Sequence, residues 1–315
     1  MELRHLRYFL AVAEELNFRR AAEKLGIAQP PLSSQIHDLE REIGVQLFRR
    51  VPKGAELTEA GGAFAAAVPT VFDKLEQAIR LARRGGRGEV GQLRVGYTGS
   101  ASFNQIVPRA LRAFRRAYPN VELILEELNS PHLLDQLNRQ RLDAAFIRPG
   151  KEPPAGFAVA PLDEEPMMVL MPSGHRLADR SFMDLSELKG EPLILFSPTL
   201  GPGLYEEVIE SCRRAGFEPT VAQIAPPQIT SIVNLVAVGL GASMVPAHVA
   251  NIQVPGVVAL RVTGSAPVAR LALVTRLDDR SVVTRNFRLL VQKVAHAPAT
   301  ADDEIVARLT EPPTA

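Results

Sequence analysis

The pattern of hydrophobic and polar positions between Phe18 and Ile43 predicts two short helices joined by a tight turn. The first helix carries a narrow apolar stripe made of Ala21, Ala22 and Leu25. It is expected to end at Gly26, because glycine readily adopts the positive φ found at helix ends. The second helix begins near Pro30-Pro31, which suit a first helical turn. Its apolar positions recur at steps of four, three and four, namely Leu32, Ile36, Leu39 and Ile43.

The outer face of the second helix is polar close to its N-terminus. It carries uncharged or weakly charged hydrogen-bonding groups at Gln29, Ser33, Ser34 and His37. In a helix-turn-helix the second helix lies in the major groove of DNA and its N-terminal residues meet the bases. The pattern therefore favours a helix-turn-helix, and an ordinary αα-hairpin with a polar outer face is the alternative.

The flanking segments favour the DNA-binding interpretation. An apolar stripe at Leu6, Phe9, Leu10 and Ala13 predicts an opening helix that covers the helix-turn-helix core. Residues 44–58 predict two short strands around a basic turn, which is a wing. Arg49, Arg50 and Lys53 concentrate positive charge there with no acid among them, as expected of contacts to phosphates. A solvated charged hairpin is the alternative.

A long amphipathic helix is predicted to follow, capped by Thr58. Its apolar positions are Phe64, Val68, Phe72, Leu75, Ile79 and Ala82. A lone helix between two domains cannot bury such a stripe against its own chain, so pairing with a second subunit is expected. Pro69 predicts a kink. The glycine-rich segment 85–91 is expected to be a hinge.

From Gln92 onward, predicted strands and helices alternate. Strands at 92–98, 121–127 and 143–148 with helices between them predict a βαβαβ unit with a parallel sheet. A second series of strands and helices spans about 167–245, so two α/β lobes are implied. A last strand at 271–275 and a helix at 284–296 are expected to return to the first lobe. Residues 297–315, rich in Ala, Pro, Thr and acids, are expected to form a mobile tail.

Composition limits the classes of protein that fit. The chain has 315 residues, of which 46% are hydrophobic and 23% charged, so it can fill the cores of two or three domains. The formal net charge of +1 means that attraction to DNA must come from local basic clusters. The single cysteine, Cys212, allows no intramolecular disulfide. No signal peptide or membrane span is apparent, and a cytoplasmic location is expected.

No catalytic or metal-binding motif is visible. Gly86, Gly88 and Gly91 match G-x-G-x-x-G, but this match follows a helix and opens a strand, which is the reverse of a dinucleotide-binding fingerprint. The six histidines lack metal-ligand spacing. We therefore expect no enzyme activity, no cofactor and no metal.

Three loops are candidates for a ligand site in the cleft between the lobes. They follow predicted strands at residues 98–102, 129–130 and 197–203. Each offers hydroxyl groups or backbone donors at a helix start, where the helix dipole favours an anion. Simple helix capping would explain any one of these loops. Three loops in corresponding positions favour a shared anion site.

The segment LRHLRYFLAVAEELNFRRAAEKLGIAQPPLSSQIHDLEREIGVQLFRR, the LTEAG that follows it and the two-lobed remainder together resemble LysR-type transcriptional regulators. The resemblance implies an α+β winged helix-turn-helix joined by a long linker helix to a two-lobed α/β, periplasmic-binding-protein-like effector domain. Expected bounds are 1–58 for the DNA-binding domain, 59–90 for the dimerising linker helix and hinge, 91–162 with 267–296 for effector subdomain I, and 163–266 for subdomain II.

Family membership would make double-stranded operator DNA, a small-molecule inducer and RNA polymerase the partners. It would also imply a homo-oligomer, usually a tetramer formed as a dimer of dimers. An activator of transcription is expected, and a repressor is the alternative that the sequence leaves open. The DNA-binding positions would be Asn17, Phe18, Gln29, Pro30, Pro31, Ser33, Ser34, His37, Arg50 and Lys53.

Within the family, the segments RVGYTGSASF, EELNS, DAAFIRPG and LILFSPTLGPG are similar to the branch that governs aromatic-compound catabolism and senses muconate- or benzoate-like acids. By this resemblance Ser100, Ser130 and Pro202 match inducer-contacting positions, and Arg148 matches an arginine beside a second site. Leu204 stands where that branch has a bulky aromatic residue. The expected effector-binding set is Ser100, Ser102, Asn129, Ser130, Arg148, Thr199, Pro202 and Leu204.

Two other classes of protein fit only part of the chain. A solute-binding protein, or a ligand sensor without a direct DNA role, would explain the lobes but not the N-terminal third, and a transport component should carry a signal peptide. An enzyme on the same lobes would need convergent titratable groups, whereas the cleft loops offer mainly hydroxyls and amides. A ligand-responsive DNA-binding regulator explains both parts.

Overall fold

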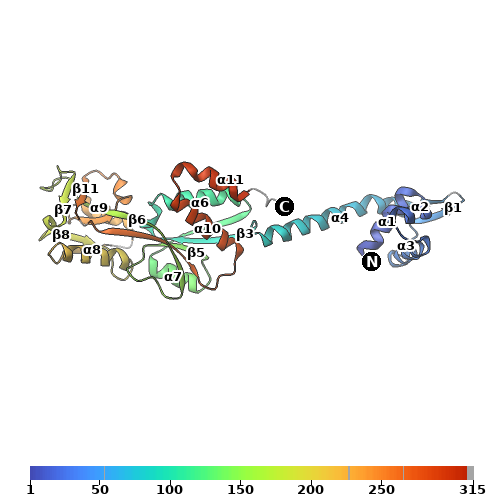
Figure 1. The fold of residues 1–315 in the computed structure, drawn as a ribbon, viewed down its shortest axis with the longest axis horizontal. Helices are drawn as coiled ribbons and strands as arrows, with labels where there is room; N and C mark the ends of the chain where they lie inside the picture. Colours follow the sequence, from blue (N-terminus) through green and yellow to red (C-terminus); the bar gives the residue numbers. More distant parts are fainter. Residues whose placement is uncertain (53, 226–227, 265, 311–315) are drawn as a thin grey trace. The chain divides into compact units, whose positions relative to one another are not determined.

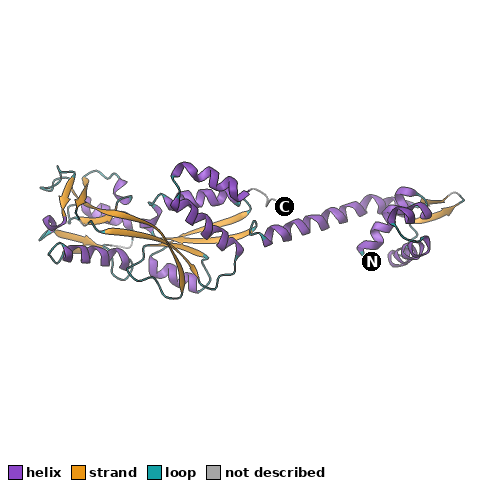
Figure 2. Cartoon of the chain, in the orientation of Figure 1, coloured by secondary structure: helices purple, strands orange, loops and turns teal. Residues whose placement is uncertain are grey.

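The computed structural model describes residues 1–52, 54–225, 228–264 and 266–310 (Figures 1 and 2). By its internal contacts the chain divides into two compact units, Met1–Arg83 and Arg84–Ala315. Each unit is described by itself, and they are called the N-terminal unit and the effector unit below.

The N-terminal unit is a three-helix core with a small hairpin and the start of a long helix. Its elements are α1 (Leu3–Glu15), α2 (Phe18–Leu25), α3 (Gln29–Ile43), β1 (Phe48–Val51), β2 (Gly54–Leu57) and α4 (Glu59–Gly86). The buried core contains one side chain or more from each element, and Phe9 of α1 lies at its centre, with ring centroids of Phe48 and Phe64 at 5.2 and 4.9 Å. The predicted winged helix-turn-helix is confirmed.

Local sequence signals set the turns of this unit. The Asn17 side chain caps α2 by accepting hydrogen bonds from two N–H groups of its first turn. Gly26 ends α2 with φ of 69°, as its position predicted. Ile43, which was predicted to be buried, is 36% exposed, because it lies in the last turn of α3 beyond the core.

The hairpin is held against the end of α1. The backbone N–H of Ala55 donates to the carbonyl oxygen of Leu16 at 2.8 Å. A Cβ at Gly54, where φ is +143°, would lie 2.4 Å from the same oxygen. Only glycine combines this backbone angle with so close an approach, so the position of the wing depends on Gly54.

The apolar stripe of the linker helix α4 is partly buried within its own unit. The prediction that this helix could not bury the stripe against its own chain was therefore wrong. Phe64, Val68 and Phe72 of α4 pack against the N-terminal core, and the Arg7 guanidinium lies 5.7 Å from the Phe72 ring centroid. Apolar side chains are exposed at Val71 and on the later part of the helix, among them Ile79 and Leu81. The helix continues through Pro69.

Among the described residues, the two lobes of the effector unit share an eight-stranded mixed sheet, and the second lobe also contains a separate two-stranded parallel sheet. The first lobe contains β3 (Gly91–Tyr97), α5 (Gly99–Ser102), α6 (Ile106–Ala117), β4 (Val121–Glu127), α7 (Ser130–Asn138), β5 (Ala144–Ile147), β12 (Val268–Arg276), α10 (Val282–His296) and α11 (Asp302–Thr310). The second lobe contains β7 (Phe182–Asp184), β8 (Pro192–Leu195), α8 (Pro202–Arg214), β9 (Thr220–Ile224), α9 (Ile229–Ala237), β10 (Ser243–Pro246) and β11 (Val257–Thr263). A 16-residue strand, β6 (Phe157–Pro172), belongs to both (Figure 1).

Strand pairing explains how the lobes are joined. β3 runs parallel to β4 and β5, as the βαβαβ pattern predicted. The first part of β6 pairs with β12, and its last part pairs with β10 and β11. β12 also pairs antiparallel with β5. The predicted return of the last strand to the first lobe is therefore confirmed, whereas β7, β11 and the first half of β6 were not predicted.

The C-terminal segment is not a mobile tail over its described part. Helix α11 packs on α6, with Val306 buried in the first-lobe core. The Arg109 guanidinium donates to both carboxylate oxygens of Asp302 at 2.8 and 3.1 Å. The acids that suggested disorder pair with a basic helix instead. Residues 311–315 lie outside the described residues.

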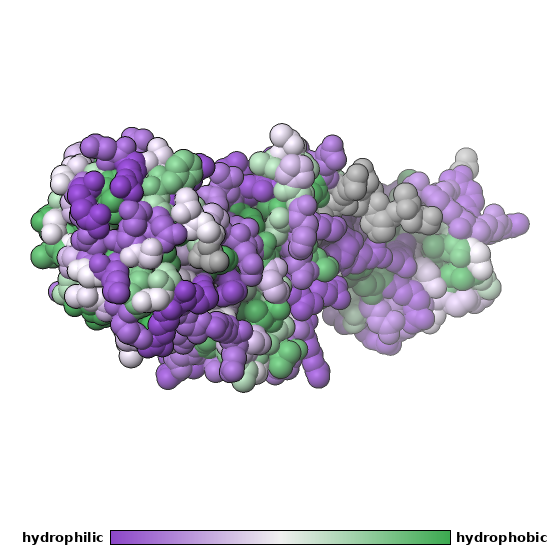
Figure 3. Space-filling model, turned by 60° about the vertical axis from the view of Figure 1, so that its left-hand side comes forward, coloured by the Kyte–Doolittle hydropathy of each residue, from purple (hydrophilic) through white to green (hydrophobic). Residues whose placement is uncertain are grey.

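The visible surface of the effector unit mixes hydrophilic and hydrophobic residues (Figure 3). Scattered exposed apolar side chains of this kind are normal on folded proteins. Among the described residues, no helix has the length and apolar content that a membrane crossing requires.

We predict that Val306→Ala lowers the free energy of unfolding by about 1.5–2.5 kcal/mol, because two buried methyl groups are lost. Urea unfolding of the full chain measures it. Asp303→Ala is the control, since that carboxylate is exposed and its ion pair with Arg116 should be worth less than about 1 kcal/mol. Equal stability of Val306→Ala and wild type would mean that α11 does not pack on α6 in solution.

Candidate functional site

The first turn of α3 presents the polar groups that the sequence singled out. Gln29 is its first residue, and Gln29, Pro30, Pro31, Ser34 and His37 are exposed, while Ser33 is half-buried. The opposite face, at Leu32, Ile36 and Leu39, is buried. The exposed groups therefore share one face at the N-terminal end of the helix, which is where recognition helices meet base edges.

Asn17 and Phe18 have structural contacts at the start of α2. Asn17 is the N-cap, and the Phe18 ring lies edge-on to Phe48 with centroids 5.7 Å apart. Both residues thus help to fix the position of α2, and both are half-buried, as Ser33 is.

The charges of the wing differ from the sequence expectation. Arg49 is paired across the hairpin with Glu56 at 2.6 Å, so one of the three cations is neutralised. Arg50 is exposed and forms no ion pair with any described residue. Lys53 lies outside the described residues. Arg50 is therefore the wing cation whose charge is free for a phosphate.

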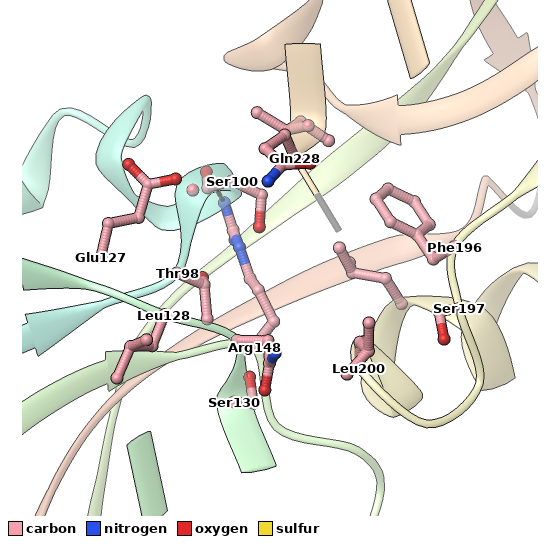
Figure 4. A pocket seen from close by; sticks show the side chains of 15 residues that line it. Thr98, Ser100, Glu127, Leu128, Ser130, Arg148, Phe196, Ser197, Leu200 and Gln228 are labelled. Carbon is pink, nitrogen blue, oxygen red and sulfur yellow. Dashed lines mark hydrogen bonds between the residues drawn. The ribbon is translucent and has the colours of Figure 1, made fainter. Parts of the chain in front are cut away.

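A second site is a pocket between the two lobes of the effector unit, with a volume of about 220 Å³ (Figure 4). Thr98, Ser100, Ser130 and Arg148 lie on its first-lobe side, and Phe196, Ser197 and Leu200 face them from the second lobe. The remaining lining residues are Gly99, Glu127, Leu128, Asn129, Gly201, Leu204, Gln228 and Ile229.

Helix starts converge on this pocket. Asn129 caps α7 by accepting from the N–H of His132 at 3.1 Å, and the buried Ser130 begins that helix. Gln228 is the N-cap residue of α9 and Ile229 is its first residue. Unpaired N–H groups and the helix dipole favour negative charge at such ends.

Among the described residues that line the pocket, Arg148 is the only arginine or lysine, and it is 4% exposed. Its guanidinium donates to Glu165 at 2.6 Å and to the Ser100 carbonyl oxygen at 3.0 Å. Burial lowers the pKa of Arg148, and the adjacent Glu165 carboxylate opposes that shift. The Nε atom of Arg148 is buried and has no hydrogen-bond partner among the described residues. An acceptor supplied by a ligand would satisfy it.

Glu165 connects the two lobes. Burial alone would raise its pKa, but Arg148 and hydrogen bonds from His248 outweigh that effect, so its pKa is lowered. Asn104 of the first lobe donates to the same carboxylate, as does the backbone N–H of His248 from the second lobe. Glu165 thus balances the charge of Arg148. The first-lobe side of the pocket at Arg148 is therefore close to electrically neutral.

Not every predicted effector residue lines this pocket. Asn129, Leu204, Ser100, Ser130 and Arg148 do, but Ser102, Thr199 and Pro202 do not. The Ser102 hydroxyl donates to the Gly99 carbonyl oxygen, and the Thr199 hydroxyl is paired with Ser197. Pro202 lines a neighbouring cavity of about 390 Å³.

The sequence prediction missed the pocket residues Glu127, Leu128, Phe196, Gln228 and Ile229. Glu127 ends β4 and Phe196 follows β8. Strand ends are recognisable in sequence, so these two residues could have been found. Gln228 and Ile229 begin α9, and the start of that helix was not considered as a ligand loop.

The described residues contain no cluster of His, Cys, Asp and Glu able to hold a metal ion. Cys212 is fully buried, and burial raises the pKa of its thiol to about 11. A thiol in that state is a poor nucleophile.

Comparison with known proteins agrees with this geometry. The model for the LysR substrate binding domain matches residues 86–295, and the model for bacterial regulatory helix-turn-helix proteins of the lysR family matches residues 3–62. The match at residues 3–62 argues against a ligand sensor without a DNA role.

Full-length relatives cover almost the whole chain. The regulator BudR of Raoultella terrigena is 38% identical over 91% of this chain and 99% of its own. The Hca operon transcriptional activator HcaR of Escherichia coli (strain K12) is 33% identical over 93% of this chain and 98% of its own. The structure of full-length CbnR with its target DNA has a TM-score of 0.80 and 28% identity, covering 94% of this chain and 100% of that one. These relatives are transcriptional regulators and not enzymes, and the chain itself belongs to the LysR family of DNA-binding transcriptional regulators with an effector-binding domain.

Proposed function

We propose that the interlobe pocket binds a small organic acid, and that this inducer controls transcription at an operator read by α3. The observation that carries the proposal is the orphaned Nε of Arg148, a buried donor in the lining of a pocket where two helix N-termini meet. A carboxylate supplies an acceptor and negative charge together, and it is planar like the guanidinium that it would face.

The rest of the lining suits an apolar body. Leu128, Phe196, Leu200, Leu204 and Ile229 provide hydrocarbon and aromatic surface. A pocket of about 220 Å³ holds a molecule of one ring. Leu204 in place of a bulkier side chain leaves that space open. An aromatic or muconate-like acid fits these features, as proposed from the resemblance.

The charge of the pocket favours a monoanion. Glu127 is exposed in the lining and forms no ion pair with any described residue. Since Arg148 is balanced by Glu165, a second ligand carboxylate would meet Glu127 without a compensating cation. We therefore place benzoate-like acids ahead of muconate-like diacids.

The assembly and the direction of control are further parts of the proposal. Leu75, Ile79 and Ala82 leave an apolar strip on the later part of α4, which a second subunit would cover. Relatedness to HcaR, which is named an activator, favours activation through RNA polymerase. A homotetramer made as a dimer of dimers is the proposed form, in the cytoplasm.

For the DNA site, Gln29→Ala should reduce the preference for operator over random DNA by about 1–3 kcal/mol, because a base-edge contact is lost. Arg50→Ala should instead weaken binding to both DNAs alike and reduce the salt slope by about one unit, because a phosphate contact is lost. Fluorescence anisotropy at several salt concentrations distinguishes the two variants. An equal loss on both DNAs in Gln29→Ala would remove Gln29 from the groove.

For the effector site, Ser130→Ala should weaken benzoate binding by about 1.5–3 kcal/mol, as expected for a hydrogen bond to a charged group. Operator affinity without ligand should stay at the wild-type value. Ser102→Ala is the control, because Ser102 is not in the lining and its hydroxyl donates to the Gly99 carbonyl oxygen. Calorimetric titration of both variants measures it, and a benzoate affinity that is unchanged in Ser130→Ala would place the inducer elsewhere.

For assembly, Ile79→Asp should dissociate the oligomer, because it puts an unpaired charge in the proposed helix contact. Gln77→Asp, also exposed on α4 but off the apolar strip, should leave the oligomer intact. Sedimentation velocity compares the two. If both variants sediment like wild type, this strip does not hold subunits together.

A further inference from the structure

A second polar cavity lies at the start of α10, away from the interlobe pocket and sharing no lining residue with it. It has a volume of about 200 Å³. Its walls come from the end of β12, the following turn and the first two turns of α10, and they are Thr275, Arg276, Leu277, Asp279, Arg280, Ser281, Thr284, Arg285 and Arg288.

The cavity has an excess of positive charge. Arg276 is paired with Asp279 at 2.8 Å and also donates to the carbonyl oxygens of Leu137 and Leu142, so its charge is used. Arg280, Arg285 and Arg288 form no ion pair with any described residue. Three guanidinium groups therefore line one small cavity without a carboxylate partner.

The helix end adds to that field. α10 is a 15-residue helix, and in the described part of the chain the Ser281 hydroxyl oxygen accepts from a single N–H of its first turn, that of Thr284, at 3.2 Å. The dipole of a helix of this length favours an anion at its N-terminus.

The side chain of Thr284 provides independent evidence for a ligand. This residue is 3% exposed, it lines the cavity, and its Oγ1 has no hydrogen-bond partner among the described residues. Burying a hydroxyl without a partner costs free energy, so native structures nearly always satisfy such a group. A ligand oxygen in the cavity would accept a hydrogen bond from this hydroxyl. This need for an acceptor is separate from the positive charge of the arginines.

We propose that this cavity binds a phosphate group, either inorganic phosphate or the phosphomonoester of a small metabolite. A tetrahedral dianion offers acceptors in several directions at once, to the Thr284 hydroxyl, to the first turn of α10 and to the arginines. A planar monocarboxylate would satisfy fewer of these donors and leave more positive charge unbalanced.

The site is next to the hinge at the start of the effector unit. The Asn286 side chain donates to the Arg87 carbonyl oxygen at 2.9 Å. A Cβ at Gly88, where φ is +68°, would lie 3.0 Å from the backbone nitrogen of Val283. The first turn of α10 therefore contacts the hinge segment, residues 85–91, and would also contact the ligand.

The test is calorimetric titration of the full chain with inorganic phosphate and, separately, with glycerol 3-phosphate. We expect saturable binding to the wild-type protein, and an affinity at least tenfold lower in the double variant Arg285→Gln/Arg288→Gln. Arg112→Gln is the matched control, because Arg112 is an exposed arginine on α6 without an ion pair to a described residue, and it should bind like wild type. Tighter binding of glycerol 3-phosphate than of phosphate would identify a phosphomonoester as the ligand class, and equal binding would identify phosphate itself.

Thr284→Val separates binding from folding. It removes only the hydroxyl and keeps the shape of the side chain, so thermal stability without phosphate should be unchanged or higher. Its phosphate affinity should fall at least about tenfold, which corresponds to the low end of the range for a hydrogen bond to a charged group. Benzoate binding should be unaffected, which makes this test independent of the interlobe pocket.

Two results would overturn the proposal. One is phosphate binding that is absent, or equal in wild type, Thr284→Val and the double arginine variant. The other concerns duplex DNA that lacks the operator. If this DNA competes with phosphate for the wild-type protein but not for Arg285→Gln/Arg288→Gln, the arginines belong to a nucleic-acid surface.

Discussion

The ion pair between Arg148 and Glu165 is the interaction on which the effector unit depends. Both side chains are almost fully buried, and removing one partner of such a pair typically costs about 3–5 kcal/mol because the other charge is left unpaired. Glu165 lies on β6, the strand that belongs to both lobes, and it also accepts hydrogen bonds from His248 of the second lobe. The same pair that joins the lobes therefore orients the arginine that faces the ligand pocket.

This arrangement offers a physical route from ligand to lobe geometry. A ligand carboxylate would bind the Arg148 guanidinium, which already binds Glu165. Since Glu165 also contacts the second lobe, the ligand and the contact between the lobes both act on the Arg148 side chain. α8 is also fixed closely to the first lobe, since a Cβ at Gly203 would lie 2.6 Å from the carbonyl oxygens of Arg148 and Pro149. A ligand can shift the lobes only by its difference in affinity for two arrangements.

Local sequence signals were enough where the structure is locally determined. Gly26 and the apolar steps of α3 predicted the helix-turn-helix, and the alternating pattern after Gln92 predicted both lobes. Long-range partners explain the errors. Residues 157–166 of β6 contain Pro161, Pro166 and three acids, and Glu165 is buried there only because Arg148 and His248 meet it. Asp302 was counted among the acids of a mobile tail because its partner, Arg109, is 193 residues away and cannot be identified from the local sequence. The Arg49–Glu56 pair depends on hairpin register, which composition does not reveal.

A crystal structure of the full chain grown with benzoate tests whether Arg148 binds the carboxylate of the ligand. We predict density in the interlobe pocket with one carboxylate oxygen about 2.7–3.2 Å from the Arg148 Nε and the ring against Leu204 and Phe196. The Arg148–Glu165 pair should remain in place. Benzoate bound outside this pocket, or bound in it with its carboxylate turned away from Arg148, would show that Arg148 does not bind the inducer.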